Sequence, residues 1–309
     1  MRSGFARTED GVQLYWRTMG PDRPVSPVVT LVCCNGVGVS TFFWKYTARA
    51  FRDRFRVLLW DYRGHGLSSS PDDVDEANLT VERSASDLRL VLDAAGVDTP
   101  VVLLGHSMGC QVILEYAKQN PAGVRALVPM FGTFGRPLDT FMDNPNSRKI
   151  FAVIHRLTKA AGRSGTRWMR PLYASPIAFS VGKSTGLVDK YYAPRADIEM
   201  YLEHMNHLDP RLFLRMVSQI ADHDLEDFLP QVAVPTLVIA GESDLFTPLH
   251  RSRKMAQLIP GAELMVVPEG SHAAIVEHPE TINRRIERFL VERVFAGETL
   301  PAEASERRA

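Results

Sequence analysis

The chain has 309 residues, 45% of them hydrophobic, and its 36 basic side chains balance 36 acidic ones. This composition is typical of a globular protein with a large core, and the lack of a basic excess argues against a nucleic-acid partner. Three cysteines, two of them adjacent, favour a reducing compartment over a disulfide framework. Because we see neither a secretory signal nor an apolar window of bilayer length, we expect a cytoplasmic protein with no membrane span.

The first part of the chain predicts a β-hairpin followed by alternating strands and helices. Residues 4–8 and 11–20 form the expected hairpin around a turn at residues 9–11. Apolar strand patterns then begin at residues 27, 56, 101 and 125, and helical patterns separate them at residues 41–55, 80–97 and 111–117. Thr80 can cap the second of these helices, and Gly96 can end it. The alternation indicates a mostly parallel sheet with helices on both faces.

The second part of the chain returns to this rhythm after a helical interruption. Residues 133–230 show helical patterns and no convincing strand, so we interpret them as a helical cap inserted between two sheet strands. Strand patterns resume at residues 235–241 and 262–268, and helical patterns at residues 248–259 and 278–295. The predicted organisation is a core in two parts (1–132 and 231–296), the cap (133–230) and a flexible tail (297–309).

A serine stands between two glycines where a predicted strand meets a predicted helix, in the sequence Gly105-His106-Ser107-Met108-Gly109. A serine hydroxyl is a weak nucleophile unless a base accepts its proton. A sharp strand–turn–helix connection lifts such a hydroxyl out of the sheet edge, and small neighbours give the turn room. The helix N-terminus also directs backbone N–H groups at nearby negative charge. Ser107 is therefore the candidate nucleophile.

The base for this serine is expected in a later loop at the same edge of the sheet. His272 lies in a glycine-containing loop directly after a predicted strand, which makes it the best candidate. His106 adjoins the serine and should point away from its hydroxyl. His65 also follows a strand and is the strongest competitor, but we interpret it as a residue that braces its own loop.

The acid and the oxyanion donors are expected at the same edge. Asp244 follows another apolar strand, and the chain order Ser, Asp, His favours it over the nearby Glu242. Its role is to hold the imidazole tautomer and stabilise the imidazolium. The backbone N–H of Met108 is one expected oxyanion donor, and that of Val37, which has glycines on both sides, is the other.

Five segments of the chain resemble, in family order, the serine hydrolases of the α/β-hydrolase fold: NGVG, WDYRGHGLSS, GHSMG, GESDLFTP and GSHAAIVEHPE. The resemblance covers roughly residues 5–131 and 230–295. It implies the α/β-hydrolase fold, with a mostly parallel central sheet and a helical cap. It also implies Ser107 as nucleophile, Asp244 as acid, His272 as base, and Val37 and Met108 as oxyanion donors.

Three positions qualify the resemblance. Asn35 stands where the family's oxyanion loop usually has histidine, and because asparagine also hydrogen-bonds to backbone we expect loop geometry, not chemistry, to change. Cys110 stands where a third small residue is common, and it is small enough to be tolerated. Haloalkane dehalogenases and epoxide hydrolases of this fold have aspartate where this chain has Ser107, so both reactions are disfavoured.

The aromatic residues near this edge suggest a largely apolar substrate pocket, with candidates Phe42, Phe43, Trp44, Phe131 and Phe246. A metal site is conceivable around His204 and His207, with Asp222, His223 and Asp224 nearby, but no recognisable ligand spacing is complete, and we expect no metal. Arg163, Arg167 and Arg170 are interpreted as a solvated face in preference to an anion site.

The sequence therefore predicts a cofactor-independent serine hydrolase that cleaves an ester, lactone or thioester with apolar flanks. C–C bond hydrolysis and cofactor-free perhydrolysis use the same residues and remain alternatives. A slow-turnover small-molecule receptor of the same fold is a further alternative. A small molecule is the expected partner, and a homo-oligomer is possible.

Overall fold

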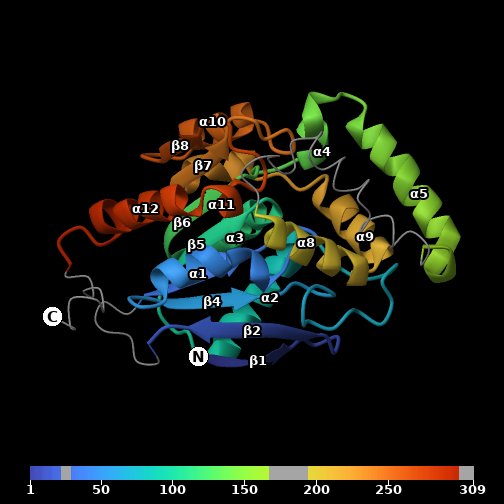
Figure 1. The fold of residues 1–309 in the computed structure, drawn as a ribbon, viewed down its shortest axis with the longest axis horizontal. Helices are drawn as coiled ribbons and strands as arrows, with labels where there is room; N and C mark the ends of the chain where they lie inside the picture. Colours follow the sequence, from blue (N-terminus) through green and yellow to red (C-terminus); the bar gives the residue numbers. More distant parts are fainter. Residues whose placement is uncertain (22–28, 167–193, 299–309) are drawn as a thin grey trace.

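The computed structural model describes residues 1–21, 29–166 and 194–298 of the chain. They contain an eight-stranded sheet in the order β1-β2-β4-β3-β5-β6-β7-β8 (Figure 1). The strands are β1 (Arg2–Arg7), β2 (Gln13–Met19), β3 (Thr30–Cys34), β4 (Arg56–Trp60), β5 (Val101–His106), β6 (Val124–Met130), β7 (Leu237–Gly241) and β8 (Glu263–Val267). The hairpin of β1 and β2 is antiparallel, as is the pairing of β2 with β4, and the other neighbouring strands are parallel. The mostly parallel sheet expected from the sequence is confirmed.

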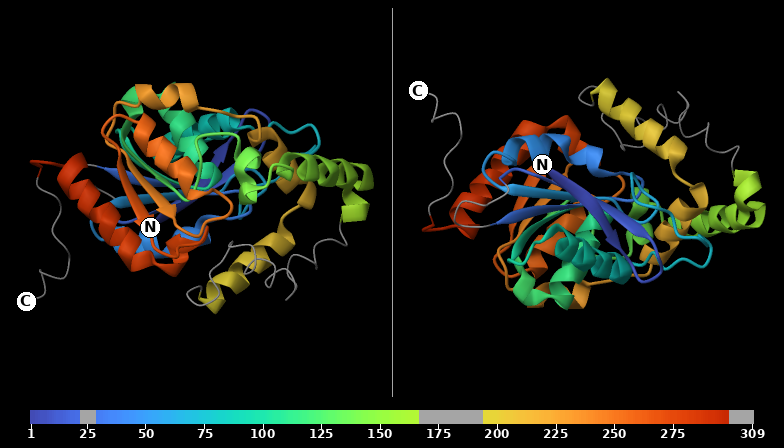
Figure 2. Two further views of the ribbon diagram at one scale, coloured as in Figure 1. Left: turned by 90° about the horizontal axis from the view of Figure 1, so that it is seen from above. Right: turned by 90° about the horizontal axis from the view of Figure 1, so that it is seen from below.

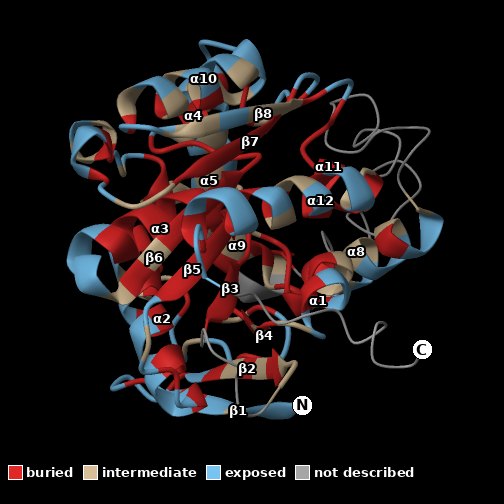
Figure 3. Cartoon of the chain, turned by 90° about the vertical axis from the view of Figure 1, so that its left-hand side faces the viewer, coloured by how far each residue is buried: buried red, intermediate tan, exposed pale blue. Residues whose placement is uncertain are grey.

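Helices cover both faces of this sheet (Figure 2). On one face lie α1 (Lys45–Phe51) and α12 (Pro279–Phe289), and on the other lie α2 (Val81–Ala95), α3 (Met108–Gln119) and α10 (Leu249–Leu258). Successive side chains of β5 point to opposite faces, so Leu103 packs on the side of α2 and α3 while Leu104 packs on the side of α1 and α12. Burial on both faces explains why the strands read as continuous apolar runs (Figure 3).

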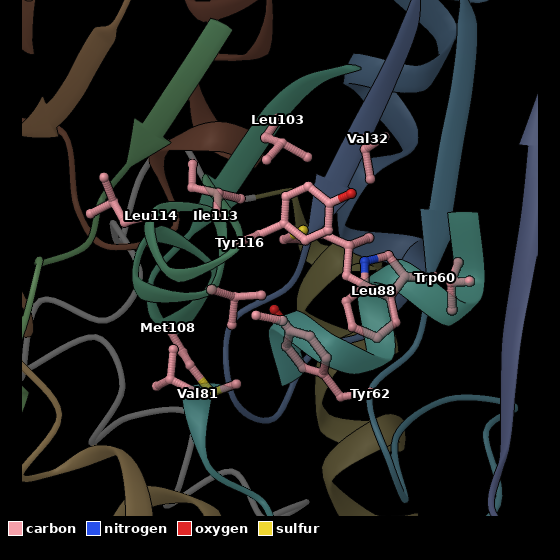
Figure 4. Packing of buried hydrophobic residues seen from close by; sticks show 14 of the residues in the cluster. Val32, Trp60, Tyr62, Val81, Leu88, Leu103, Met108, Ile113, Leu114 and Tyr116 are labelled. Atoms are coloured by element: carbon pink, nitrogen blue, oxygen red, sulfur yellow. The ribbon is translucent and has the colours of Figure 1, made fainter. Parts of the chain in front are cut away.

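Helix α2 illustrates how local signals set its boundaries. The hydroxyl of Thr80 accepts a hydrogen bond from the backbone N–H of Arg83, and Gly96 ends the helix with a left-handed φ of 67°. Between them the stripe that includes Leu88 is buried against the sheet. Figure 4 shows this packing, in which Leu88 lies near Trp60 and the rings of two tyrosines.

The expected helix boundaries needed correction in two places. The helix expected at residues 41–55 is a 3-10 turn (Thr41–Trp44) followed by the shorter α1. The long pattern at residues 211–229 divides into α9 (Pro210–Ile220) and a 3-10 helix (Glu226–Gln231). Between these two, the backbone carbonyl of His223 accepts a hydrogen bond from the N–H of Arg136, so tertiary pairing interrupts the helical pattern.

The regular elements that the structure describes between β6 and β7 are helices joined by loops; we call the described residues of this connection the helical insertion. It contains α4 (Pro137–Thr140), a 3-10 turn (Phe141–Asp143), α5 (Ser147–Thr166), α8 (Arg195–His207), α9 and the 3-10 helix at Glu226–Gln231. In Figure 1 it lies on the side toward which β4 points, where the parallel strands end. Arg167 and Arg170 lie outside the described residues. Across the described ranges, no helix combines the length and apolarity that a membrane crossing requires.

Short elements complete the described fold. A 3-10 turn (Pro121–Gly123) precedes β6, α11 (Ala274–Glu277) follows the loop after β8, and a π-helical turn (Leu290–Val294) extends α12. The loop between β8 and α11 carries His272. The loops that follow β3, β5, β7 and β8 therefore converge at one edge of the sheet, as parallel strands require.

Candidate active site

Ser107 occupies a strained turn between β5 and α3. Its backbone has φ 56° and ψ −118°, a conformation that residues other than glycine rarely adopt. The turn is held by a hydrogen bond from the N–H of Ser107 to the carbonyl of Met130, 3.1 Å. A Cβ on Gly105 would lie 2.4 Å from the Gly109 carbonyl oxygen, and one on Gly109 would lie 2.2 Å from that of Cys34. The two glycines thus allow backbone contacts that no other residue permits.

The hydroxyl of Ser107 begins a chain of hydrogen bonds through His272 to Asp244. Its Oγ lies 3.0 Å from His272 Nε2, and His272 Nδ1 lies 2.9 Å from Asp244 Oδ2. His272 and Asp244 are buried, whereas Ser107 is partly accessible. The structure thus brings together the three side chains that the sequence predicted, from loops after three different strands.

Asp244 is held in its ionised form by its hydrogen-bond donors. Oδ1 accepts from the backbone N–H groups of Phe246 and Thr247, and Oδ2 accepts from the Thr247 hydroxyl at 2.7 Å. Burial raises the pKa of Asp244, but the neighbouring His272 and these donors outweigh that effect, so its pKa is lowered overall. Its competitor Glu242 instead accepts the backbone N–H of Glu269.

The other two candidate histidines support the site without reaching the Ser107 hydroxyl. His65 Nε2 accepts the N–H of Gly38 at 3.1 Å, while its Nδ1 lies 3.0 Å from the carbonyl of Arg63. His65 therefore braces its own loop through Arg63, as the sequence suggested, and also the loop after β3, which the sequence did not indicate. His106 Nε2 donates to the carbonyl of His272 at 2.9 Å, a role that the sequence did not indicate. Burial lowers the pKa of His65 to about 4 and that of His106 to about 3, which keeps both rings neutral.

The loop after β3 lies directly against the serine. A Cβ on Gly36 would come within 2.9 Å of the Ser107 Cβ, so glycine permits this approach. Asn35 fixes the loop from behind, since its Nδ2 donates to the carbonyl of Trp60 at 2.7 Å and its Oδ1 accepts from the Trp44 indole at 2.8 Å. Asparagine therefore does hydrogen-bond to backbone here, as we expected of the residue that replaces the family's histidine.

Two cavities meet at Ser107 and His272. The larger has a volume of about 510 Å³ and a mostly apolar wall, and it also borders Val37 and Met108. The smaller has a volume of about 80 Å³ and borders Gly36 and Val37. Both predicted oxyanion donors thus border the space beside the serine hydroxyl. The Met108 side chain is buried in the core (Figure 4).

The aromatic pocket candidates separate into two groups. Phe42 and Phe43 line the smaller cavity, and Phe246 lines the larger one, where its ring stacks on His272 with centroids 5.2 Å apart. Trp44 and Phe131 are fully buried core residues instead. The Trp44 indole donates to Asn35 and the Phe131 ring packs beside His106, so neither side chain lines the two cavities described.

Comparison with known proteins identifies the family to which the chain belongs. Residues 29–279 match the family model described as the alpha/beta hydrolase fold. The chain belongs to this family. A protein of Stutzerimonas stutzeri named as the carbamate hydrolase RutD is 29% identical over 267 residues, which are 86% of this chain and 91% of that protein. The match confirms the expected family, and the hydrolase names of its relatives agree with the expected enzyme class.

Solved structures share the fold of this α/β hydrolase. A hydrolase from Pseudomonas aeruginosa superposes with a TM-score of 0.73 at 24% identity, covering 93% of this chain and 98% of that one. An enol-lactonase from Burkholderia xenovorans superposes with a TM-score of 0.73 at 21% identity, covering 93% of this chain and 99% of that one. At these identities the likeness shows the fold alone.

The insertion of this α/β hydrolase contributes cavity walls that the sequence did not predict. Tyr201, on α8, borders both cavities, and Ile198 borders the smaller one. Phe141, Leu214 and other apolar residues from α4 through α9 line the larger cavity. Their helical spacing was visible in the sequence, but the direction in which each helix faces was not.

The histidines of the insertion have partners or packing roles of their own. His204 packs against the rings of Phe42 and His65, and His223 lies 3.0 Å from Gln111 Nε2. His207 Nδ1 lies 2.8 Å from the carbonyl of Glu203. Within the described ranges, no group of three or more potential ligand side chains is arranged to hold a metal ion.

Proposed function

We propose that this α/β hydrolase is a serine hydrolase that cleaves a carboxylic ester, lactone or thioester with apolar flanks through an acyl-enzyme intermediate. The observation that carries the proposal is the hydrogen-bonded chain from Asp244 through His272 to Ser107, 2.9 Å and 3.0 Å long in its two links. An ionised acid, an oriented imidazole and a hydroxyl at hydrogen-bond distance are the parts that nucleophilic acyl transfer needs.

The proposed reaction uses these groups in sequence. Ser107 Oγ attacks the carbonyl carbon while His272 Nε2 accepts its proton, and Asp244 stabilises the imidazolium. The N–H groups of Val37 and Met108 donate to the oxyanion of the tetrahedral intermediate. His272 then gives its proton to the leaving oxygen or sulfur. Water enters, loses a proton to His272 and attacks the acyl carbon, which releases the acid and restores Ser107.

The cavities support apolar groups on the substrate. The larger cavity is walled by side chains such as Phe141, Leu214 and Phe246, which favour an alkyl or aryl group. We assign the helical insertion as a cap, because its helices supply this wall above the serine. Closure of the site by apolar side chains excludes water and strengthens the electrostatic interactions within it.

Carbamate hydrolysis is a second candidate, because relatives that are 27–29% identical to this chain are named as carbamate hydrolases. The same attack by Ser107 on a carbamate carbon forms a carbamoyl-enzyme, which water then hydrolyses. The 510 Å³ apolar cavity favours the ester over a small polar carbamate.

Hydrolysis of p-nitrophenyl esters from acetate to decanoate, beside the variant Ser107→Ala, tests the proposal. We expect many turnovers with an optimum chain length, and a loss of at least about 10⁴-fold in kcat in the variant. Fluorophosphonate should label the wild type and leave Ser107→Ala unlabelled. Labelling with only a single burst of product would instead support a receptor, and labelling without any ester turnover would support C–C bond hydrolysis.

A further inference from the structure

A buried polar chain reaches the larger cavity at Gln111, which lines it together with Ser107 and His272. Glu115 and Gln111 lie on successive turns of α3, and His223 lies in the loop after α9. His223 Nε2 lies 3.4 Å from Glu115 Oε2, and Gln111 Nε2 lies 3.0 Å from His223 Nδ1. Gln111 is 1% exposed and Glu115 4%, so the chain lies inside the protein.

The partners in this chain set the orientation of the Gln111 amide. The hydrogen bond from His223 is the main cause that lowers the pKa of Glu115 to about 2, so its carboxylate is an acceptor and His223 Nε2 carries a hydrogen. On the other side of the ring, His223 Nδ1 lies beside the NH₂ group of Gln111. The amide nitrogen of Gln111, Nε2, also lies 3.5 Å from the backbone carbonyl oxygen of His223, which can only accept a hydrogen bond. The contact with the backbone carbonyl places the NH₂ group toward His223 and leaves Oε1 as the remaining polar atom of Gln111.

The Gln111 side chain therefore brings a carbonyl acceptor to an apolar wall. Gln111 lines the larger cavity, and its Oε1 accepts no hydrogen bond from the residues that the structure describes. Other buried polar side chains along this wall direct their hydroxyl hydrogens to protein acceptors: Thr133 to Gly135, Ser147 to Phe141 and Thr247 to Asp244. An acceptor at the wall of an apolar cavity meets a donor only from a molecule that enters the cavity, so a ligand that supplies one gains affinity.

The position of Gln111 on α3 indicates how far this acceptor lies from the carbon that Ser107 attacks. Gln111 is four residues beyond Ser107, which is about 6 Å along the axis at about 1.5 Å per residue. It thus lies on the next turn of the same helix that begins at the nucleophile. A donor a few bonds from the reacting carbonyl matches this separation.

We propose that Gln111 is a specificity residue for substrates that carry an N–H or O–H donor close to the reacting carbonyl, followed by an apolar chain. N-acyl amino esters and N-acyl amino lactones are the class with this chemistry. His223 and Glu115 act as positioning residues, because they hold the amide in the orientation that presents its oxygen. This proposal rests on the proposed serine hydrolase function.

Two p-nitrophenyl esters that differ in one group test the assignment. The ester of N-hexanoylglycine carries an N–H where the ester of 4-oxononanoic acid carries a CH₂, and the two acyl chains are equally long. Since the esters differ in intrinsic reactivity, the quantity measured is their ratio of kcat/KM, compared between variants after subtraction of the Ser107→Ala background. The ratio is taken within one preparation, so incomplete folding of a variant cancels.

We expect Gln111→Leu to lower this ratio by at least about tenfold, and Gln111→Met to do the same. His223→Leu should lower it by a smaller factor, a change that general destabilisation would not produce. Thr133→Val, in the same cavity wall, should keep the wild-type ratio. A ratio unchanged within about twofold in Gln111→Leu, or lowered equally in Thr133→Val, would overturn the role of Gln111 alone. No hydrolysis of either ester by the wild type, with no fluorophosphonate labelling, would overturn the serine hydrolase function as well.

Discussion

The loops around Ser107 and the helices of the insertion reach the same cavity by different means. In the loops, buried polar side chains hold the backbone by directional hydrogen bonds: Asn35 joins the backbone of β4 to an indole, and His65 holds the N–H of Gly38. The insertion contributes mainly apolar side chains. Its helix α5 also exposes Ile150, Val153, Ile154 and Leu157, which are 43–65% accessible.

This difference separates chemistry from selectivity. Hydrogen bonds fix distance and angle, so groups that must meet a reacting atom are placed by them. Apolar packing has no preferred direction and responds mainly to volume. Changes in the loops should therefore alter the rate for every substrate, and changes in the insertion should alter which substrate is preferred.

The sharpest test of the loop region is Asp244→Asn, for which we expect the largest effect. The amide keeps the size of the side chain but favours the wrong imidazole tautomer of His272, so kcat should fall by about 10⁴-fold. The loss should be similar for short and long p-nitrophenyl esters, while the circular dichroism spectrum stays that of the wild type. A loss confined to long esters would contradict the separation of chemistry from selectivity.

Asp61 holds two loops, because its carboxyl group accepts the backbone N–H groups of Thr41 and Leu67. We expect the ionisation of this buried carboxyl group to lower the stability of the folded state. Burial raises the pKa of Asp61 to about 6, against the effect of these donors. A carboxyl with a raised pKa binds a proton more readily in the folded state, so its contribution to stability is greatest at low pH and falls as pH rises from about 4 to about 6.

Asp61→Asn makes this contribution measurable. The free energy of unfolding of the variant, relative to the wild type, should increase by about 2 kcal/mol between pH 4 and pH 6 and level off above about pH 7. Urea titrations at several pH values give this difference, and the constant loss of one acceptor in the variant does not affect its slope. If the difference in unfolding free energy between Asp61→Asn and the wild type did not change with pH, ionisation of Asp61 would not lower the stability of the fold.

The smallest effect is expected from the insertion. Val217 on α9 lines the larger cavity, and Val217→Trp should fill part of it. We expect kcat/KM for p-nitrophenyl decanoate to fall by about tenfold and that for the acetate to stay within about twofold. Leu157→Ser, on the exposed side of α5, serves as the matched control with an unchanged profile. Equal losses for both esters in Val217→Trp would place the insertion among the parts that set the rate.

The sequence predicted the sheet and the principal residues of the site because both depend on local signals. Apolar runs that end in Gly-, Ser- and Asp-containing loops identify the ends of parallel strands, and these ends meet at one edge. Ser107, Asp244 and His272 each follow such a strand, so their proximity follows from the strand pattern alone.

Tertiary structure alone decided which side chains face the cavities and which support them. Phe131 follows the end of β6 even more closely than Phe246 follows the end of β7, yet Phe131 turns into the core and Phe246 reaches His272. Gln111 contacts His223, which lies in a loop 112 residues further along the chain, and no spacing in the sequence indicates this partner. Periodicity reports that a residue is buried, but the packing of whole helices determines what it is buried against.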